Sequence, residues 1–373
     1  MHLNCYKLII PGKKSDHILL SGSNPQPNLQ LNTMYRFVQK KTFFLGLLLS
    51  LGLGSCGYFD RSKENAPADF KLFVPTGATV QTVLDSLRPH VKELKTFESA
   101  AASLELKRVH PGRYTIAKGA TNKQIVRMLQ FGEQDEIQIT VGNYNSVFEL
   151  ASKLDPLLEA SAPALIKAVG NRKEARGLDT LQWIYFLSPN TYRFHWTQTP
   201  GEIIAKIVAP YEKYWTEEKR QQLQKSGLTE LQAVTLASIV QLESYRKDEQ
   251  PRVAGLYHNR LKLGMKLDAD PTVIFAKKQQ QNAWTTKIER VYFKDLRIPS
   301  PYNTYINKGL PPGPICMPNP SAIDAVLFPE KTDFVYFVAD PSRPGYHLYA
   351  KTLAEQEKNA KVYRDWVEKN GIR

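Results

Sequence analysis

Cysteine is scarce in this sequence of 373 residues, which contains only Cys5, Cys56 and Cys316. None of the three belongs to a CxxC pair, and the seven histidines are scattered along the chain rather than clustered. The sequence therefore gives no basis for a disulfide framework or a metal site, and we expect neither a metal nor a cofactor. His347, in "GYHLYAK", has a context that is typical of a strand residue rather than a catalyst.

Signatures of nucleic-acid binding are also missing, because there is no RNA-reading motif, no zinc-finger spacing and no long basic arm. The formal net charge is nevertheless +14, with basic and acidic residues mixed as in "YEKYWTEEKRQQLQK". Such a basic surface suits an anionic membrane or an acidic polymer at least as well as a nucleic acid. The length and the 42% hydrophobic content indicate a globular protein of two or three domains.

The clearest local signal lies over 34–59, where the basic stretch "YRFVQKK" precedes an uncharged apolar run over 43–54. This pattern predicts a signal sequence or signal anchor with the cytoplasm on its basic side. "LGSC" also resembles a bacterial lipobox, so a lipidated Cys56 is the alternative to a membrane span. Residues 1–33 carry no motif, which makes them a non-native or disordered leader and Met34 the candidate start.

The rest of the chain predicts an α+β fold in several parts. A polar linker over 60–69 leads to the order strand, helix, helix, strand, helix over 70–133, which indicates a compact α+β module. The central region over 134–228 starts with a strand and is then mostly helical. The region over 229–373 combines helices, stiff loops, two strands in "DFVYFVAD" and "YHLYAK", and a charged terminal helix.

One helix in the last region carries a candidate catalytic acid. "TELQAVTLASIVQLES" opens with Thr229 and Gln232 at capping-box spacing and then runs almost wholly apolar, which predicts a buried helix. Glu243 would share a face with Leu236 and Ile239. A carboxyl group on an apolar face loses hydration, so its pKa should rise toward neutral, as a general acid requires. A glutamate that reaches solvent or pairs with a nearby arginine is the alternative.

A second candidate feature is the stretch "SPYNTYINKGLPPGPI" over 300–315. Its prolines fix backbone angles and remove hydrogen-bond donors, so the segment should be a stiff loop. Exposed aromatic and amide side chains on a stiff loop would suit the binding of a ligand, and a surface turn with core tyrosines is the alternative.

These features together are sufficient for cleavage of a glycosidic bond. Ordinary hydrolases use two carboxyl groups, one as acid and one as base or nucleophile. One carboxyl group suffices when a hydroxyl of the substrate is the nucleophile, provided that polar and aromatic groups hold the sugars. Glu243 and the loop over 300–315 supply these groups, and Asp270 is either an orienting residue or the second carboxyl of a hydrolase.

Four stretches resemble the MltG (YceG-like) endolytic murein transglycosylases: "LASIVQLES", "GLYHNRLKLGMKLDADPTVIF", "YNTYINKGLPPGPI" and "DFVYFVAD". The module over 70–133 looks like the LysM-like module of that family. The resemblance implies a bacterial inner-membrane protein, single-pass or lipid-anchored, with a mixed α/β catalytic domain in the periplasm. It would cleave the MurNAc–GlcNAc bond of nascent glycan strands and leave 1,6-anhydro-MurNAc ends. Its partners would be peptidoglycan strands and peptidoglycan synthases (penicillin-binding proteins).

The resemblance also assigns residues. The catalytic glutamate falls on Glu243, whereas the first acid of the family's Ser-Ile-(Val/Ile)-Glu-Lys-Glu run is replaced by Gln241. The substrate-binding residues that it implies are Tyr302, Asn303, Thr304, Tyr305, Asp270, Thr272 and Asn259.

Three alternatives remain open on the sequence alone. Glu243 and Asp270 would flank the bond in a two-carboxylate glycan hydrolase, and a tethered cell-wall-binding protein would need neither. "FLSPNTYRFHW", in the central region, is either a helix break or a second loop that contacts the glycan.

Overall fold

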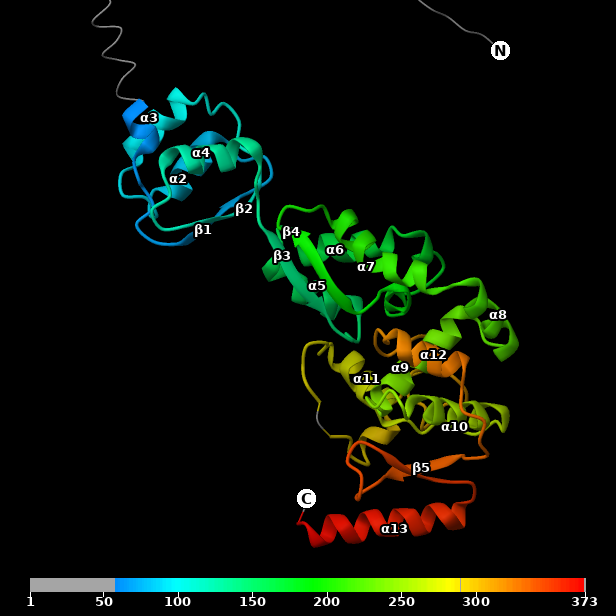
Figure 1. The fold of residues 1–373 in the computed structure, drawn as a ribbon. Coiled ribbons are helices and arrows are strands. Elements are labelled where there is room, and N and C mark those ends of the chain that lie inside the picture. Colours follow the sequence, from blue (N-terminus) through cyan, green and yellow to red (C-terminus); the bar gives the residue numbers. More distant parts are fainter. Residues whose placement is uncertain (1–57, 289, 372–373) are drawn as a thin grey trace, which may run out of the picture. The chain divides into compact units, whose positions relative to one another are not determined.

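A computed structural model describes residues 58–288 and 290–371 (Figure 1). The predicted leader over 1–33 and the predicted anchor over 34–59 lie outside the described residues, apart from the last positions of the anchor. Among the described residues, no helix has both the length and the apolar character that crossing a membrane requires. The mixture of helices and small antiparallel sheets confirms the predicted α+β class.

The first module has the predicted order of elements. They are β1 (Phe70–Val74), α2 (Val80–Leu87), α3 (Leu94–Ser103), β2 (Gly112–Ile116) and α4 (Asn122–Phe131). β1 and β2 pair antiparallel, with Leu72 opposite Tyr114. Thr121 caps α4 by accepting a hydrogen bond from the backbone N–H of Gln124, and Gly132 ends the helix at a φ of 69°. The helices and strands enclose a hydrophobic core of their own, in which Tyr114 is fully buried.

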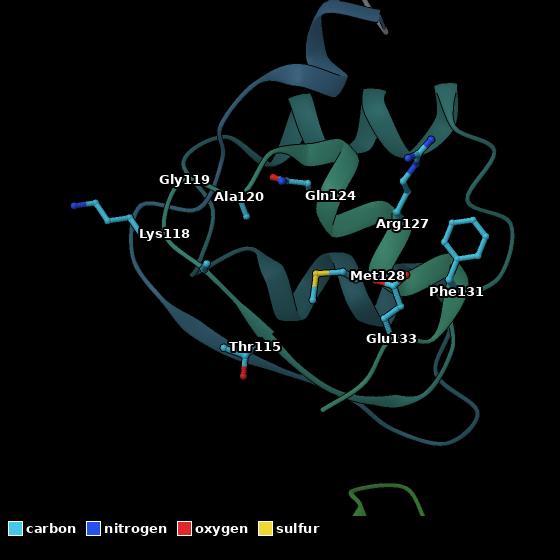
Figure 2. Close-up of a pocket in the computed structure, with 10 residues that line it drawn as sticks. Thr115, Lys118, Gly119, Ala120, Gln124, Arg127, Met128, Phe131 and Glu133 are labelled. Carbon is cyan, nitrogen blue, oxygen red and sulfur yellow. The ribbon is translucent and has the colours of Figure 1, made fainter. Parts of the chain in front are cut away.

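A groove of about 570 Å³ lies on the first module, between α4 and the turn that follows β2. Figure 2 shows Gln124, Arg127 and Phe131 projecting from α4, and Lys118 at the turn. The ring of Phe131 is 68% exposed, although it is one of the largest apolar side chains of the module.

The central region pairs two strands that are far apart in sequence. Its elements are β3 (Glu136–Val141), α5 (Val147–Leu154), η1 (Asp155–Leu157), α6 (Ala162–Gly170), η2 (Lys173–Ala175), η3 (Gln182–Phe186), β4 (Asn190–His195), α7 (Pro200–Tyr214) and α8 (Glu217–Ser226). β3 pairs antiparallel with β4 in a register that sets Ile139 opposite Tyr192. The stretch "FLSPNTYRFHW" is therefore mainly a strand, and both readings of it as a helix break or a loop are wrong.

The last region contains the predicted buried helix. Its elements are α9 (Glu230–Glu243), α10 (Gln250–Lys262), α11 (Asp270–Gln281), η4 (Asp295–Arg297), α12 (Pro320–Leu327), β5 (Tyr336–Ala339), β6 (His347–Ala350) and α13 (Leu353–Lys369). β5 and β6 form an antiparallel pair in which Ala339 lies opposite His347. The side chains from Ala233 to Val240 are all buried, and α10, α11 and α12 contact α9.

One hydrophobic core joins the central and last regions. It runs from Ile139 on β3 through Ile239 on α9 to Leu327 on α12. Each large apolar side chain in such a core contributes roughly 1.5–3 kcal/mol. The predicted boundary at 228/229 therefore does not separate two cores, and α9 is held on several sides at once.

Candidate active site

Glu243 is the last residue of α9, at the edge of the large core. Thr229 caps the start of this helix by accepting a hydrogen bond from the backbone N–H of Gln232, as the capping-box spacing predicts. Ser244 follows with an extended backbone, at a φ of −135°, and takes the chain away from the helix axis. Leu236, about two turns earlier, is fully buried, whereas Glu243 itself is half-buried. The carboxyl group thus lies where an apolar face reaches the surface.

The hydroxyl of Tyr257, on α10, is the hydrogen-bond donor to Glu243. Its oxygen lies 3.0 Å from Oε1 of Glu243. The ring of Tyr257 is fully buried, and burial together with the nearby negative charge raises the pKa of this phenol well above its usual value. The hydroxyl therefore keeps its proton at physiological pH and can donate to Oε1 whenever Glu243 is ionised.

The pKa of Glu243 is raised to about 7. Burial is the main cause, since a carboxylate with little access to water is poorly solvated. The hydrogen bond from Tyr257 acts in the opposite direction, the negative charge of Asp270 raises the pKa further, and the positive groups of His347 and Arg260 lower it. The acid predicted from the sequence therefore titrates in the range that general acid–base catalysis uses.

Asp270 and Tyr305 form a polar pair near this acid. Asp270 is exposed at the first position of α11, and its Oδ1 accepts a hydrogen bond of 2.7 Å from the hydroxyl of Tyr305. Tyr305 is half-buried, and burial and this hydrogen bond raise the pKa of its phenol. The structure thus brings together Glu243, Asp270 and Tyr305 from three separate segments.

The other residues of the loop over 300–315 have a different role from the one expected. Asn303 is fully buried, and its amide nitrogen donates to the carbonyl oxygens of Leu296 and Ile298, at 3.0 and 2.9 Å. Its amide oxygen accepts from the backbone N–H of Tyr305. Because all its hydrogen-bonding groups serve the protein, Asn303 fixes the backbone of the loop rather than contacting a substrate.

Thr304 and Thr272 are also structural. Their hydroxyl oxygens lie 2.9 Å apart, and that of Thr304 also accepts from the backbone N–H of Ala269. Both side chains are at most 1% exposed. They join the loop to the start of α11 and so hold Asp270 and Tyr305 in position relative to each other. The expected substrate contacts of these two threonines are therefore not available.

Tyr302 is a core residue. It is 2% exposed, and its ring packs against Phe275 with the ring centroids 4.6 Å apart. Its hydroxyl has no hydrogen-bond partner among the described residues. The expectation that Tyr302 binds the glycan is therefore wrong, because the side chain is buried. Tyr302 is a core tyrosine, which was the alternative.

Asn259 likewise serves the fold. Its amide nitrogen donates to the carbonyl oxygens of Thr332 and Phe334, at 2.7 and 3.0 Å. These bonds hold the segment before β5 against α10. Nearby, a Cβ on Gly255 would lie 2.3 Å from the carbonyl oxygen of Glu330, so the two segments touch backbone to backbone.

Two ionisable residues near Glu243, Glu249 and His347, were not expected from the sequence to belong to this site. Glu249, which is 4% exposed, accepts hydrogen bonds from the backbone N–H of His347 at 2.8 Å and from the Ser244 hydroxyl at 2.8 Å. Nδ1 of His347 lies 3.1 Å from Oε2 of the same carboxylate. Burial alone would raise the pKa of Glu249, but the hydrogen bonds from His347 and Ser244 lower it overall. These hydrogen bonds fix the loop that follows α9.

Gln241, which replaces an acid of the resembled motif, also has a structural contact. Its amide oxygen lies 3.1 Å from the backbone nitrogen of Asn319, from which it accepts a hydrogen bond. A carboxylate at this position would make the same bond, so the substitution preserves the packing of α9 on the segment before α12.

A comparison with known proteins agrees with this geometry. The model of a family described as "YceG-like family" matches residues 72–362. The chain is 28% identical over 320 residues to an "Endolytic murein transglycosylase" of Bacillus subtilis (strain 168), a match that covers 81% of this chain and 86% of that protein. It is 26% identical over 370 residues to a protein of the same name from Streptococcus pneumoniae serotype 2, covering 87% of this chain and 64% of that protein.

A solved structure shares the fold. It is the crystal structure of a putative yceG-like protein from Listeria monocytogenes, with a TM-score of 0.53 and 24% sequence identity. The match covers 78% of this chain and 98% of that one.

Proposed function

The chain belongs to the YceG-like family, and from this membership and the state of Glu243 we propose that it is an endolytic murein transglycosylase. The observation that carries the proposal is a half-buried carboxyl group with a pKa of about 7 at the surface end of a rigid helix. Such a group is neutral and ionised in comparable amounts near neutral pH, so it can both give and take a proton within one reaction cycle.

In the first step, neutral Glu243 gives its proton to the oxygen that links MurNAc to GlcNAc. The bond between C1 of MurNAc and this oxygen breaks, and GlcNAc leaves with a free hydroxyl. With the hydroxyl of Tyr257 donating to Oε1, Oε2 is the oxygen that carries the transferred proton. Asp270, paired with Tyr305, stabilises the positive charge that develops on the muramic ring.

In the second step, the C6 hydroxyl of the same muramic residue attacks C1. Its proton passes to the Glu243 carboxylate, which restores the neutral acid, and a 1,6-anhydro ring closes. No water is consumed. The rigidity of the loop over 300–315, held by Asn303 and the pair of Thr272 and Thr304, keeps the Asp270–Tyr305 pair in position for both steps.

Glu243→Gln tests this assignment, because the amide keeps the shape of the side chain but has no proton to transfer. We expect release of anhydro-ended fragments from murein strands to fall roughly 10²–10⁴-fold, measured by mass spectrometry of the digest. Glu218→Gln, an exposed change on α8, is the matched control and should keep the parent rate. Release at the parent rate by Glu243→Gln would disprove the assignment.

A two-carboxylate hydrolase is the second candidate, because the charge of Asp270 acts directly on Glu243. The products separate the two reactions. Attack by water leaves a reducing end, whereas attack by the C6 hydroxyl leaves an anhydro end. A purely wall-binding tether would be indifferent to Glu243→Gln.

We also propose that the first module is LysM-like and binds glycan. Its groove combines the exposed ring of Phe131 with the amide of Gln124 and the cations of Arg127 and Lys118, which suits the apolar faces and hydroxyls of sugars.

The location of the protein rests on the sequence over 34–59. We propose that this segment anchors the chain in the bacterial inner membrane, with the catalytic part in the periplasm near peptidoglycan synthases. Cys56→Ser separates the two kinds of anchor. Loss of the protein from the membrane fraction would indicate lipidation, and retention would indicate a membrane span.

A further inference from the structure

Two loops next to Glu243 carry a cluster of tyrosine and arginine side chains, three of them exposed and one half-buried. The first loop, between α9 and α10, begins directly after Glu243 and contributes Tyr245 and Arg246. The second, between β5 and β6, contributes Arg343 and Tyr346. We call these four residues the Tyr–Arg patch. The mechanism described above uses none of them.

The Tyr–Arg patch is a stack of alternating rings and cations. The guanidinium carbon of Arg246 lies 5.5 Å from the ring centre of Tyr245 and 5.2 Å from that of Tyr346. The guanidinium of Arg343 lies over Tyr346 at 4.2 Å. Each contact falls within the range of cation–π attraction. Both arginines are therefore held in place before any ligand arrives.

Hydrogen bonds fix the same loops. Arg246 donates to the carbonyl oxygen of Pro344 at 3.3 Å, and the hydroxyl of Tyr346 donates to Asp248 at 2.9 Å. Gly345 adopts a φ of +87°, and a Cβ there would lie 2.6 Å from the hydroxyl oxygen of Tyr245. The positive φ favours glycine at this position, and the side chain of Tyr245 lies close against it.

The patch has unused binding capacity. In the described part of the chain, the guanidinium groups of Arg246 and Arg343 contact tyrosine rings and one carbonyl oxygen, and no salt bridge joins either of them to a carboxylate. The charge of Arg343 acts on Asp340, and Asp248 accepts from Tyr346, so these two carboxylates offset part of the positive charge. Lys247 adds a third exposed cation. The ring of Tyr245 is 71% exposed, so it does not serve the core. Oriented guanidinium groups of this kind bind carboxylates, often through two parallel hydrogen bonds.

The position of the patch identifies the part of the substrate that it meets. Tyr245 is separated from Glu243 only by Ser244, and Tyr346 precedes His347, whose charge acts on Glu243. When the scissile bond of a glycan strand lies at Glu243, the substituents of the neighbouring sugars therefore lie beside the Tyr–Arg patch. In murein these substituents are short peptides attached to MurNAc, and they carry free carboxylates.

We propose that the Tyr–Arg patch is a subsite for the peptide carboxylates of murein strands, which makes this enzyme select strands with acidic stem peptides. The inference rests on the proposed function for its substrate. The aromatic rings support the guanidinium groups and contact the apolar parts of the peptide, while Arg246 and Arg343 bind carboxylates.

The test compares strands with free peptide carboxylates and the same strands after their carboxylates are converted to amides. Binding is measured with the full chain carrying Glu243→Gln, so that strands are not consumed, and turnover is measured with Glu243 intact. We expect the chain with an intact patch to prefer the acidic strands roughly tenfold in Kd and in KM. Arg246→Gln combined with Arg343→Gln should abolish this preference.

Two further variants control for charge and fold. Lys358→Gln combined with Arg364→Gln removes the same charge from exposed positions of α13 and should keep the preference. Arg246→Lys combined with Arg343→Lys keeps the charge and should retain much of the preference, which would show that the glutamine variant lost a charge rather than its fold.

The outcomes separate this proposal from the proposed function. If the patch variant keeps the full preference for acidic strands, the subsite is disproved. If it instead loses binding to phosphatidylglycerol vesicles while the strand preference stays, the patch contacts lipid and the proposal is overturned. Absence of anhydro-ended products from the parent protein would refute the transglycosylase, while the binding comparison would still decide the subsite.

Discussion

At the scale of single residues, the ionisation of Glu243 sets the pH dependence of the reaction. The first step needs the neutral acid, which predominates below the pKa of about 7 and disappears above it. Activity should therefore decline as the pH rises through 7. Two neighbours act on this pKa in opposite directions, and each of them can be removed by a substitution of nearly equal shape.

Tyr257→Phe should move the decline to higher pH. The phenol hydrogen bond stabilises the carboxylate and lowers the pKa of Glu243. Its loss raises that pKa, so the acid stays neutral up to a higher pH. We expect a displacement of roughly half to one pH unit in the profile of kcat/KM. Tyr214→Phe, which removes a hydrogen bond to Asp324 elsewhere in the structure, is the matched control. A profile that coincides with that of the parent would refute the role of Tyr257.

Asp270→Asn should move the decline to lower pH. The negative charge of Asp270 raises the pKa of Glu243. Without it the pKa falls, so the acid ionises at a lower pH. The variant should retain measurable turnover below pH 6, and its products should still end in anhydro rings. If turnover fell by roughly 10³-fold or more at every pH, Asp270 would be an essential base or nucleophile rather than only a stabilising charge, and the hydrolase mechanism would be favoured.

At the scale of elements, the loop over 300–315 depends on one buried amide. Asn303→Ala would leave the carbonyl oxygens of Leu296 and Ile298 without their donor inside the protein. We expect the free energy of unfolding to fall by about 2–4 kcal/mol, measured by chemical denaturation.

A matched control exists in the same loop. Asn307 also donates to two backbone carbonyl oxygens, at 2.8 and 2.9 Å, but it is exposed, so water can replace it. Asn307→Ala should therefore cost less than about 1 kcal/mol. A rise in KM for Asn303→Ala without any loss of stability would instead indicate that Asn303 contacts the substrate directly, as the sequence suggested.

Regular elements were predictable where periodicity and caps agreed. The capping pair and the apolar run predicted α9, which spans Glu230–Glu243 with Thr229 as its cap. β4 was missed because its residues read as a proline-marked interruption, and its strand character comes from pairing with β3, far away in sequence. α11 was not predicted either, because a proline usually interrupts a helix, whereas Pro271 occupies the first turn, where proline is tolerated.

The candidate site was predictable in part. The apolar face of α9 was enough to place Glu243 and to indicate the direction of its pKa. The roles of Tyr302, Asn303 and Thr304 were not predictable, because an irregular loop has no period that tells which side chains point inward. Tyr257 escaped notice because it contacts the acid only when α10 folds back against α9.

At the scale of the whole molecule, the described chain contains two large hydrophobic cores with different tasks, beside a small third cluster around Val273 and Ile298. The large core encloses α9 on several sides and holds Glu243 rigidly. The smaller core supports the first module and the groove beside α4. If the first module binds the same strand as the catalytic part, it raises the local concentration of glycan at the catalytic part. This increase in affinity is larger for strands with more sugars.

The groove of the first module therefore predicts a dependence on substrate length. Arg127→Gln combined with Phe131→Ala should lower retention of the full chain on insoluble murein by roughly tenfold, because a stacking ring and a cation are lost together. Co-sedimentation measures this retention, and Arg88→Gln, an exposed change of equal charge outside the groove, should leave it intact. The rise in KM should be larger for long strands than for short ones, since short strands do not engage a second site. Equal effects at all lengths, or unchanged retention, would mean that the groove does not bind murein.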